Sequence, residues 1–382
     1  MDFAQIPSPC YVLDEKLLRQ NLILMNRVKN EAGVHIICAF KGYAMWSTFP
    51  LVRQYLDGAT ASSLYEARLC FEEMESLAHT YAAVYFPEDF EEIMHYSSHI
   101  SFNSLTQFNQ YYPSVLEWNR TENHQISCGV RMNPEFSVVE TDLYNPSKAG
   151  SRLGEDLQNF KGVLPEGVEG IHVHALCESS AKDTEGLIQR VETIIGDWLP
   201  RLKWLNLGGG HLMTHPDYDV THLIKVLKHF KEKYPHLDVI LEPGSAVGWN
   251  TGVLVSKVLD IVNNHGIKTL MLDVSYTAHM PDTLEMPYRP RIRDATDPVE
   301  GKPTYRIGGT SCLSGDYMSE YSFEKEINVG DTIILEDMIH YTMVKTSMFN
   351  GVPHPSIGIW TEGNTFKLVR KFNYEDYKNR LS

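Results

Sequence analysis

The chain has 382 residues, of which 43% are apolar and 22% charged, and its formal net charge is -15. This composition is typical of a globular protein, and the length suits two domains, each with its own core. The acidic balance argues against a nucleic-acid partner, whose phosphates require a basic surface.

The N-terminus and the cysteines predict a cytoplasmic protein. The first ten residues, MDFAQIPSPC, contain an acid and two prolines where a signal peptide would have basic and apolar regions. No stretch approaches the ~20 apolar residues that span a membrane, so we expect no membrane partner. The six cysteines are scattered and form no CxxC pair, which suits a reducing compartment and gives no zinc-ribbon or dithiol motif.

Segments typical of strands alternate with segments typical of helices between residues 15 and 244. Ser63 and Glu66 have capping-box spacing before a predicted helix. Repeated strand–helix units predict a parallel sheet, and we expect an α/β fold with a TIM-type (β/α)8 barrel rather than a doubly wound sheet. The clearest predicted strands are residues 35–40, 170–175, 204–207 and 238–241.

The pattern changes after residue 245, where amphipathic helices become scarce and β-branched residues frequent. We expect a second, all-β domain formed by residues 245–382 together with residues 1–14. Its predicted strands are residues 11–13, 253–262, 269–274, 332–335 and 340–346.

Polar residues that can do chemistry follow the predicted barrel strands, and these strand ends meet on one face of a barrel. Lys41 can act as a nucleophilic amine if its pKa is lowered, although most lysines are solvated. Gly208, Gly209 and Gly210 can present backbone N–H groups to a phosphate, or simply form a tight turn. Glu242 would need a partner when buried, such as a protonated pyridine nitrogen or a neighbouring basic residue.

Two further signals have several interpretations. His172 and His174 alternate on a predicted strand, so they would share a face, where they could bind a metal, pack in the core or stack on a cofactor. No third ligand at useful spacing supports a metal, and we expect none. Residues 309–316 (GTSCLSGD) place Cys312 among small residues, where it could donate a proton or be an inert buried thiol.

Nine segments in this order resemble the pyridoxal-phosphate (PLP) decarboxylases of the alanine-racemase-like fold, which include diaminopimelate, ornithine and arginine decarboxylases. The resemblance covers nearly the whole chain and implies a PLP enzyme. The segments are residues 38–41 (CAFK), 61–66 (ASSLYE), 131–134 (RMNP), 151–154 (SRLG), 174–177 (HALC), 208–210 (GGG), 242–244 (EPG), 312–316 (CLSGD) and 341–342 (YT).

The resemblance implies that Lys41 holds PLP as a Schiff base. It also implies that His174 stacks on the pyridine ring and that Glu242 pairs with the ring nitrogen, while the glycines bind the phosphate. The implied cofactor-binding residues are Lys41, His174, Gly209, Gly210, Glu242 and Tyr341.

The resemblance further implies that Cys312 is catalytic and reaches the site from a partner subunit, so that a homodimer shares its active sites. Within the family, the likeness is greatest to enzymes whose substrate is an α-amino acid with a long cationic polyamine tail. Such a tail needs acidic partners. Asp273 is the first candidate, and the others are Asp316, Glu242, Asp282 and Glu285.

The chain departs from the family at two positions. Leu313 follows Cys312 where relatives often have an acid, which disfavours an ornithine-like or diaminopimelate-like substrate. Ser245 follows the EPG segment where many relatives have an arginine, so the phosphate would depend more on backbone N–H groups and hydroxyls.

Alternatives remain open from the sequence. The nearest is a diaminopimelate or basic amino-acid decarboxylase of the same fold. Three more distant alternatives are also considered. The segment around Cys312 argues against a racemase, and the β-rich C-terminal part argues against a non-catalytic PLP carrier. The glycine triplet argues against an aldolase without PLP.

Overall fold

A computed structural model describes residues 1–138, 145–286 and 288–382. The chain divides into two compact units. Asn21–Val247 form the larger unit, and Met1–Gln20 with Gly248–Ser382 form the smaller one. No helix among the described residues combines the length and the apolar character needed to cross a membrane.

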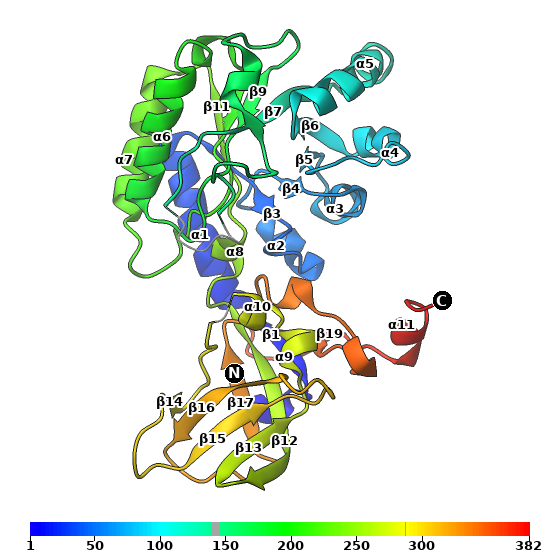
Figure 1. Ribbon diagram of the computed structural model, residues 1–382, viewed down its shortest axis with the longest axis vertical. Helices are drawn as coiled ribbons and strands as arrows, with labels where there is room; N and C mark the ends of the chain where they lie inside the picture. The colour runs from blue at the N-terminus through cyan, green and yellow to red at the C-terminus, as the bar shows by residue number, and fades with distance from the viewer. Residues whose placement is uncertain (139–144, 287) are drawn as a thin grey trace. The chain divides into compact units, whose positions relative to one another are not determined.

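The larger unit is a parallel β-barrel (Figure 1). Its strands pair in the order β2-β11-β10-β9-β7-β6-β5-β4-β3, with β8 beside β7. Because only Ile37 separates β2 from β3, this one segment pairs with β11 on one side and β4 on the other and closes the barrel. The strands are β2 (His35–Ile36), β3 (Cys38–Ala39), β4 (Ala59–Ala61), β5 (Ala78–Tyr81), β6 (Ser97–Phe102), β7 (Ser127–Asn133), β8 (Glu155–Asp156), β9 (Gly170–His172), β10 (Trp204–Asn206) and β11 (Asp238–Leu241). The predicted barrel fold is confirmed.

Side-chain caps begin several of the helices between the barrel strands. Ser63 accepts a hydrogen bond from the backbone of Glu66, and Ser180 forms a full capping box with Asp183. In Figure 1, α6 and α7 lie side by side on the outside of the barrel. The helices are α1 (Glu15–Ala32), α2 (Phe49–Val52), α3 (Leu64–Leu69) continued by a π-helical turn (Cys70–Met74), α4 (Phe90–His95), α5 (Leu105–Thr121), α6 (Ala181–Ile195), α7 (Val220–Lys233) and α8 (Ser245–Gly248).

Two glycines let neighbouring barrel strands approach the large ring of Trp204. A Cβ atom on Gly170 would lie 1.9 Å from that ring, and one on Gly129 would lie 2.3 Å from it. The indole N–H donates to Ser127 Oγ over 2.8 Å. Any larger residue at either glycine would therefore displace the ring from the buried cluster that it forms with Ile37 and Ile240.

The smaller unit is a curled, mostly antiparallel sheet with the strand order β14-β16-β15-β13-β12-β1-β18-β19, and β17 pairs with β12. The N-terminal strand β1 lies between β12 and β18. The strands are β1 (Cys10–Asp14), β12 (Gly252–Asn264), β13 (Ile267–Leu272), β14 (Ala295–Thr296), β15 (Thr304–Gly308), β16 (Tyr317–Phe323), β17 (Thr332–Glu336), β18 (Ser356–Trp360) and β19 (Phe366–Arg370). The short helices are α9 (Tyr276–His279), α10 (Asp282–Glu285) and α11 (Tyr374–Lys378).

Two predicted strands differ from the structure. Residues 340–346 contain a 3-10 helix at Met343–Lys345 instead of a strand, and Tyr341 has a φ of 32°, which no strand accommodates. The strand predicted at residues 170–175 ends at His172, so His174 lies in the loop beyond it. The predicted alternation of His172 and His174 along one strand is therefore wrong.

Candidate active site

The structure gathers four of the predicted features at one end of the barrel. Lys41 follows β3, His174 follows β9, the glycine triplet follows β10 and Glu242 follows β11, and these strands are neighbours around the barrel. Close packing joins the glycine triplet to His174, since a Cβ atom on Gly208 would lie 2.6 Å from His174 Nδ1. Their shared location is that expected of an active site at the carboxyl ends of barrel strands.

Glu242 is a buried carboxylate with a 7% exposed side chain. Its Oε1 accepts a hydrogen bond of 2.6 Å from Asn206 Nδ2, and its Oε2 lies 3.6 Å from His172 Nε2. Burial raises the pKa of Glu242, while hydrogen bonds from Asn206 and Thr60 and the positive charges of Arg131 and Lys41 lower it. A buried carboxylate in these surroundings is suited to a cationic or N–H partner.

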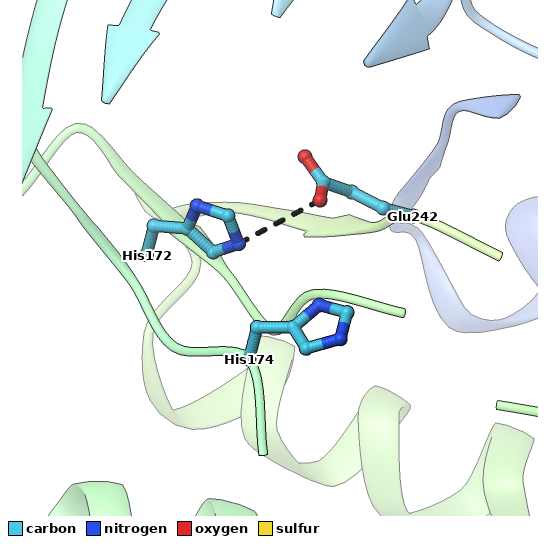
Figure 2. A group of neighbouring side chains, drawn as sticks. All are labelled: His172, His174 and Glu242. Atoms are coloured by element: carbon cyan, nitrogen blue, oxygen red, sulfur yellow. Dashed lines mark ion pairs between the residues drawn. The ribbon is translucent and has the colours of Figure 1, made fainter. Parts of the chain in front are cut away.

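His172 is also buried, and Figure 2 shows the Glu242 carboxylate directed toward its ring. Neither ring nitrogen has a hydrogen-bond partner among the described residues. Burial and then the charge of Arg131 hold the pKa of His172 well below its usual value, so the ring is neutral. One potential metal-ligand atom from each of His172, His174 and Glu242 lies within 4.8 Å of the others. Glu242 thus has the spacing of a third metal ligand beside the two histidines, which the sequence did not reveal.

The ring of His174 is held by the glycine turn. Its Nδ1 accepts the N–H of Gly209 over 3.0 Å. Burial, followed by the charges of Lys41 and Arg131, keeps the pKa of His174 well below its usual value. The neutral ring therefore carries its hydrogen on Nε2, with its orientation fixed from the turn. Stacking on a cofactor stays a prediction.

Lys41 lies at the open end of the barrel. The side chain is accessible to solvent, yet protein atoms surround it closely enough that desolvation lowers its pKa, and Arg131 lowers it further. The charges of Cys177 and Glu242 act in the opposite direction. A lowered pKa increases the neutral, nucleophilic fraction of the amine.

A close backbone contact fixes the chain after Lys41 against the chain after Glu242. A Cβ atom on Gly42 would lie 2.9 Å from the Cα of Gly244. Both positions therefore need glycine, and the amine and the carboxylate are held in one rigid arrangement by the backbone that carries them.

The glycine triplet is required by packing as well as by any ligand. Gly208 and Gly210 have φ angles of +70° and +91°. A Cβ atom on Gly209 would lie 2.6 Å from the backbone oxygen of Glu242, and one on Gly210 would lie 2.3 Å from the backbone of Leu176. The Gly209 N–H already donates to His174 Nδ1. The predicted contact with the phosphate therefore depends more on the N–H of Gly210.

Sequence reasoning assigned no role to Arg131, Asn206 or Thr60. Arg131 is 5% exposed, donates to the His174 backbone oxygen over 3.3 Å and lies 4.7 Å above the ring of Tyr81. Asn206 ends β10, and Thr60 lies in β4. The signal that could have found them is a single polar residue inside an otherwise apolar barrel strand.

The other predicted site residues belong to the smaller unit. Cys312 is exposed, and its backbone N–H donates to Asn350 Oδ1 over 2.7 Å. Both oxygens of Asp316 accept backbone N–H groups, from Thr277 and Ser311. These bonds shape the loop that carries Cys312.

Asp273 accepts hydrogen bonds from Ser8 Oγ and from the backbone of Lys257, and burial raises its pKa. Tyr341 has a strained, left-handed backbone, a feature that often marks functional positions. The roles predicted for these residues stay predictions.

The barrel end fits PLP. It combines a desolvated lysine, a buried carboxylate, an oriented neutral histidine and a turn of three glycines close enough for backbone N–H groups to meet a phosphate.

Known proteins resemble the chain along its whole length. The family model described as "Pyridoxal-dependent decarboxylase, C-terminal sheet domain" matches residues 10–339. "Carboxyaminopropylagmatine decarboxylase" of Synechocystis sp. is 48% identical over 99% of this chain and 96% of its own. "Carboxynorspermidine/carboxyspermidine decarboxylase" of Campylobacter jejuni is 39% identical over 100% of both.

The solved structures agree. The crystal structure of carboxynorspermidine decarboxylase complexed with norspermidine, from Campylobacter jejuni, matches with a TM-score of 0.90 at 38% identity. It covers 98% of this chain and 100% of that one. Proteins named diaminopimelate decarboxylase are more distant, at 22% and 28% identity for two of them.

Proposed function

The chain belongs to the family of pyridoxal-dependent decarboxylases, and we propose that it removes the α-carboxylate of carboxynorspermidine, carboxyspermidine or both. It is a PLP-dependent enzyme of polyamine biosynthesis. The observation that carries the choice of substrate is full-length similarity to the Campylobacter jejuni enzyme, in sequence and in fold. The sequence-based prediction of this activity is confirmed at that level.

The barrel residues supply the binding and orienting steps. PLP, when bound, supplies an electron sink for the electrons left as CO2 departs. Lys41, whose pKa is lowered by desolvation, would offer its amine to the cofactor, and the buried carboxyl group of Glu242 would be the partner of a protonated ring nitrogen. His174 supports the ring from a fixed orientation, because the Gly209 N–H holds its Nδ1.

A substrate with a polyamine tail needs an acid with a free oxygen, and Asp282 meets this requirement best. Its side chain is 7% exposed. Oδ2 accepts the hydroxyls of Tyr288 and Thr342, whereas Oδ1 has no partner among the described residues. Asp273 and Asp316 have both carboxylate oxygens engaged. Asp282 is therefore a buried acid of the smaller unit that has an oxygen available for a cationic nitrogen.

A second candidate substrate is carboxyaminopropylagmatine. It is favoured by the 48% identity to the Synechocystis enzyme, which exceeds the 39% to the Campylobacter enzyme. The candidates share a carboxylated aminopropyl group and differ at the far end, where agmatine carries a planar guanidinium instead of an amine. The planar group needs a forked acceptor, whereas an ammonium needs a point contact.

A substrate panel tests the assignment. We expect CO2 release with carboxynorspermidine or carboxyspermidine to have a kcat/KM roughly 100-fold above that with diaminopimelate, ornithine or arginine, because those shorter substrates leave buried polar groups unpaired. Carboxyaminopropylagmatine is measured beside them. If the kcat/KM for carboxyaminopropylagmatine were tenfold above the values for carboxynorspermidine and carboxyspermidine, the assignment would move to this second candidate. A preference for diaminopimelate would contradict both proposed assignments.

The active site is also proposed to be completed by a second copy of the chain. In this arrangement the thiol of Cys312 gives its proton to the substrate carbon that loses CO2, and the thiolate is reprotonated from solvent. Support comes from the exposure of Cys312 on a loop held by Asp316. All six cysteines are free thiols, which also supports the proposed cytoplasmic location.

Mixing two inactive variants tests the shared site. Lys41→Ala and Cys312→Ala chains, each nearly inactive alone, are expected to regain about a quarter of wild-type activity when reassorted in equal amounts, since half of the two-fold symmetric dimers then hold one intact site. Light scattering checks the dimer mass. No gain over the separate variants, or a fully active Cys312→Ala enzyme, would contradict the proposal.

A further inference from the structure

His211 follows the glycine triplet, and neither the fold nor the proposed chemistry explains why a histidine stands there. Its side chain is 1% exposed. The ring Nδ1 lies 3.0 Å from the hydroxyl oxygen of Thr184, a fully buried residue of α6. A single buried hydrogen bond between side chains thus joins the glycine turn to a helix on the outside of the barrel.

The ring of His211 is neutral. Burial lowers the pKa of His211 to about 4, against a smaller raising effect from the backbone carbonyls of Leu207 and Gly208. The Thr184 hydroxyl also lies 3.4 Å from the backbone oxygen of Ser180. It can therefore donate to that oxygen and accept a hydrogen from Nδ1, or donate to Nδ1 and leave the ring hydrogen on Nε2. Nε2 is buried and has no hydrogen-bond partner in the described part of the chain.

A turn of three glycines needs such an anchor. Glycine loses more conformational freedom than any other residue when it is ordered. Other bonds already hold parts of this turn: the Gly210 oxygen accepts the N–H of Ser179 over 2.8 Å, and the Gly208 oxygen accepts the N–H of Glu242 over 2.9 Å. His211 fixes the remaining end, where the chain leaves Gly210.

We propose that His211 is a positioning residue that, through Thr184, locks the glycine turn in the orientation that binds the phosphate group of PLP. The proposal rests on the proposed function in taking this turn as the phosphate site. His211 and Thr184 touch the turn rather than the ring of the cofactor, so their effect should be confined to ligands that carry a phosphate.

The test compares two probes, pyridoxal phosphate and pyridoxal, on the full-length chain after removal of the cofactor. Thr184→Val keeps the shape of the side chain and removes the hydroxyl. Loss of one buried hydrogen bond should weaken pyridoxal phosphate about tenfold, whereas the affinity for pyridoxal should change less than about twofold. Thr184→Ser, which restores the hydroxyl, should bind both probes like wild type.

Two further variants sharpen the result. His211→Leu should reproduce the phosphate-specific loss, and the double variant with Thr184→Val should lose no more than either alone, because the two residues act through one bond. Thr193→Val is the matched control: its exposed hydroxyl on the same helix bonds only the backbone of Gln189.

Equal weakening of both probes, or an unchanged pyridoxal phosphate affinity in Thr184→Val, would overturn the proposal. Failure of the proposed function is a separate result, since the wild-type chain itself would then show no preference for the phosphorylated probe.

Discussion

Replacing Lys41 with alanine is expected to lower decarboxylation by roughly four orders of magnitude or more and to remove covalent attachment of the cofactor. The physical reason is that Lys41 supplies the only primary amine among the four features gathered at this end of the barrel, and a primary amine is the group that forms a Schiff base. Borohydride reduction followed by peptide mass spectrometry should find the cofactor on the Lys41 peptide of wild type and not in the variant.

A surface lysine provides the control for this measurement. Lys203 is exposed and pairs with Glu169, which precedes β9. Lys203→Ala should therefore retain activity and the labelled Lys41 peptide. Labelling of a different lysine in Lys41→Ala, with turnover preserved, would show that the amine has been misassigned.

Glu242→Gln is expected to lower kcat by roughly 10²–10³ while the protein stays folded and binds its cofactor. The amide can still accept the hydrogen bond from Asn206, but it has no charge with which to keep a proton on the ring nitrogen. Because the substituted side chain has nearly the same shape, thermal unfolding should change little. The readouts are kcat, visible absorbance of the bound cofactor and the unfolding temperature.

Glu169→Gln is the matched control, since it removes a carboxylate that pairs with Lys203 and accepts the hydroxyl of Ser127. Its kcat should equal that of wild type. A Glu242→Gln variant that kept more than about a tenth of the wild-type kcat would contradict this role. The charge of the buried carboxylate would then not be needed to keep a proton on the ring nitrogen.

The sequence predicted the barrel because strand-like runs alternate with helix-like runs, and three of the predicted strands are short apolar runs followed by a distinctive polar residue or glycine. Lys41, the glycine triplet and Glu242 stand directly after such runs, so their common location follows from the topology of a parallel barrel. Periodicity was less informative for His174, because β9 ends at His172 and the chain turns before the second histidine.

The contacts of the supporting residues could not be predicted from the sequence. Asn206 and Thr60 are isolated polar residues within strands, and nothing in their spacing relates them to Glu242. The same holds for Thr184 and His211, whose hydrogen bond joins a helix to a loop. Contacts of this kind depend on how elements pack, which local pattern does not encode.

Barrel closure ties the assembly of the active site to the end of barrel synthesis. The strand just before Lys41 pairs His35 and Ile36 with Ile240 and Leu241, roughly 200 residues later in the chain, and pairings so distant carry a high entropic cost and form late. A nascent chain therefore holds neither the amine beside the carboxylate nor a complete cofactor pocket until β11 has emerged from the ribosome. Cofactor binding should therefore occur only once the barrel has folded completely, and a chain truncated before β11 should bind no cofactor.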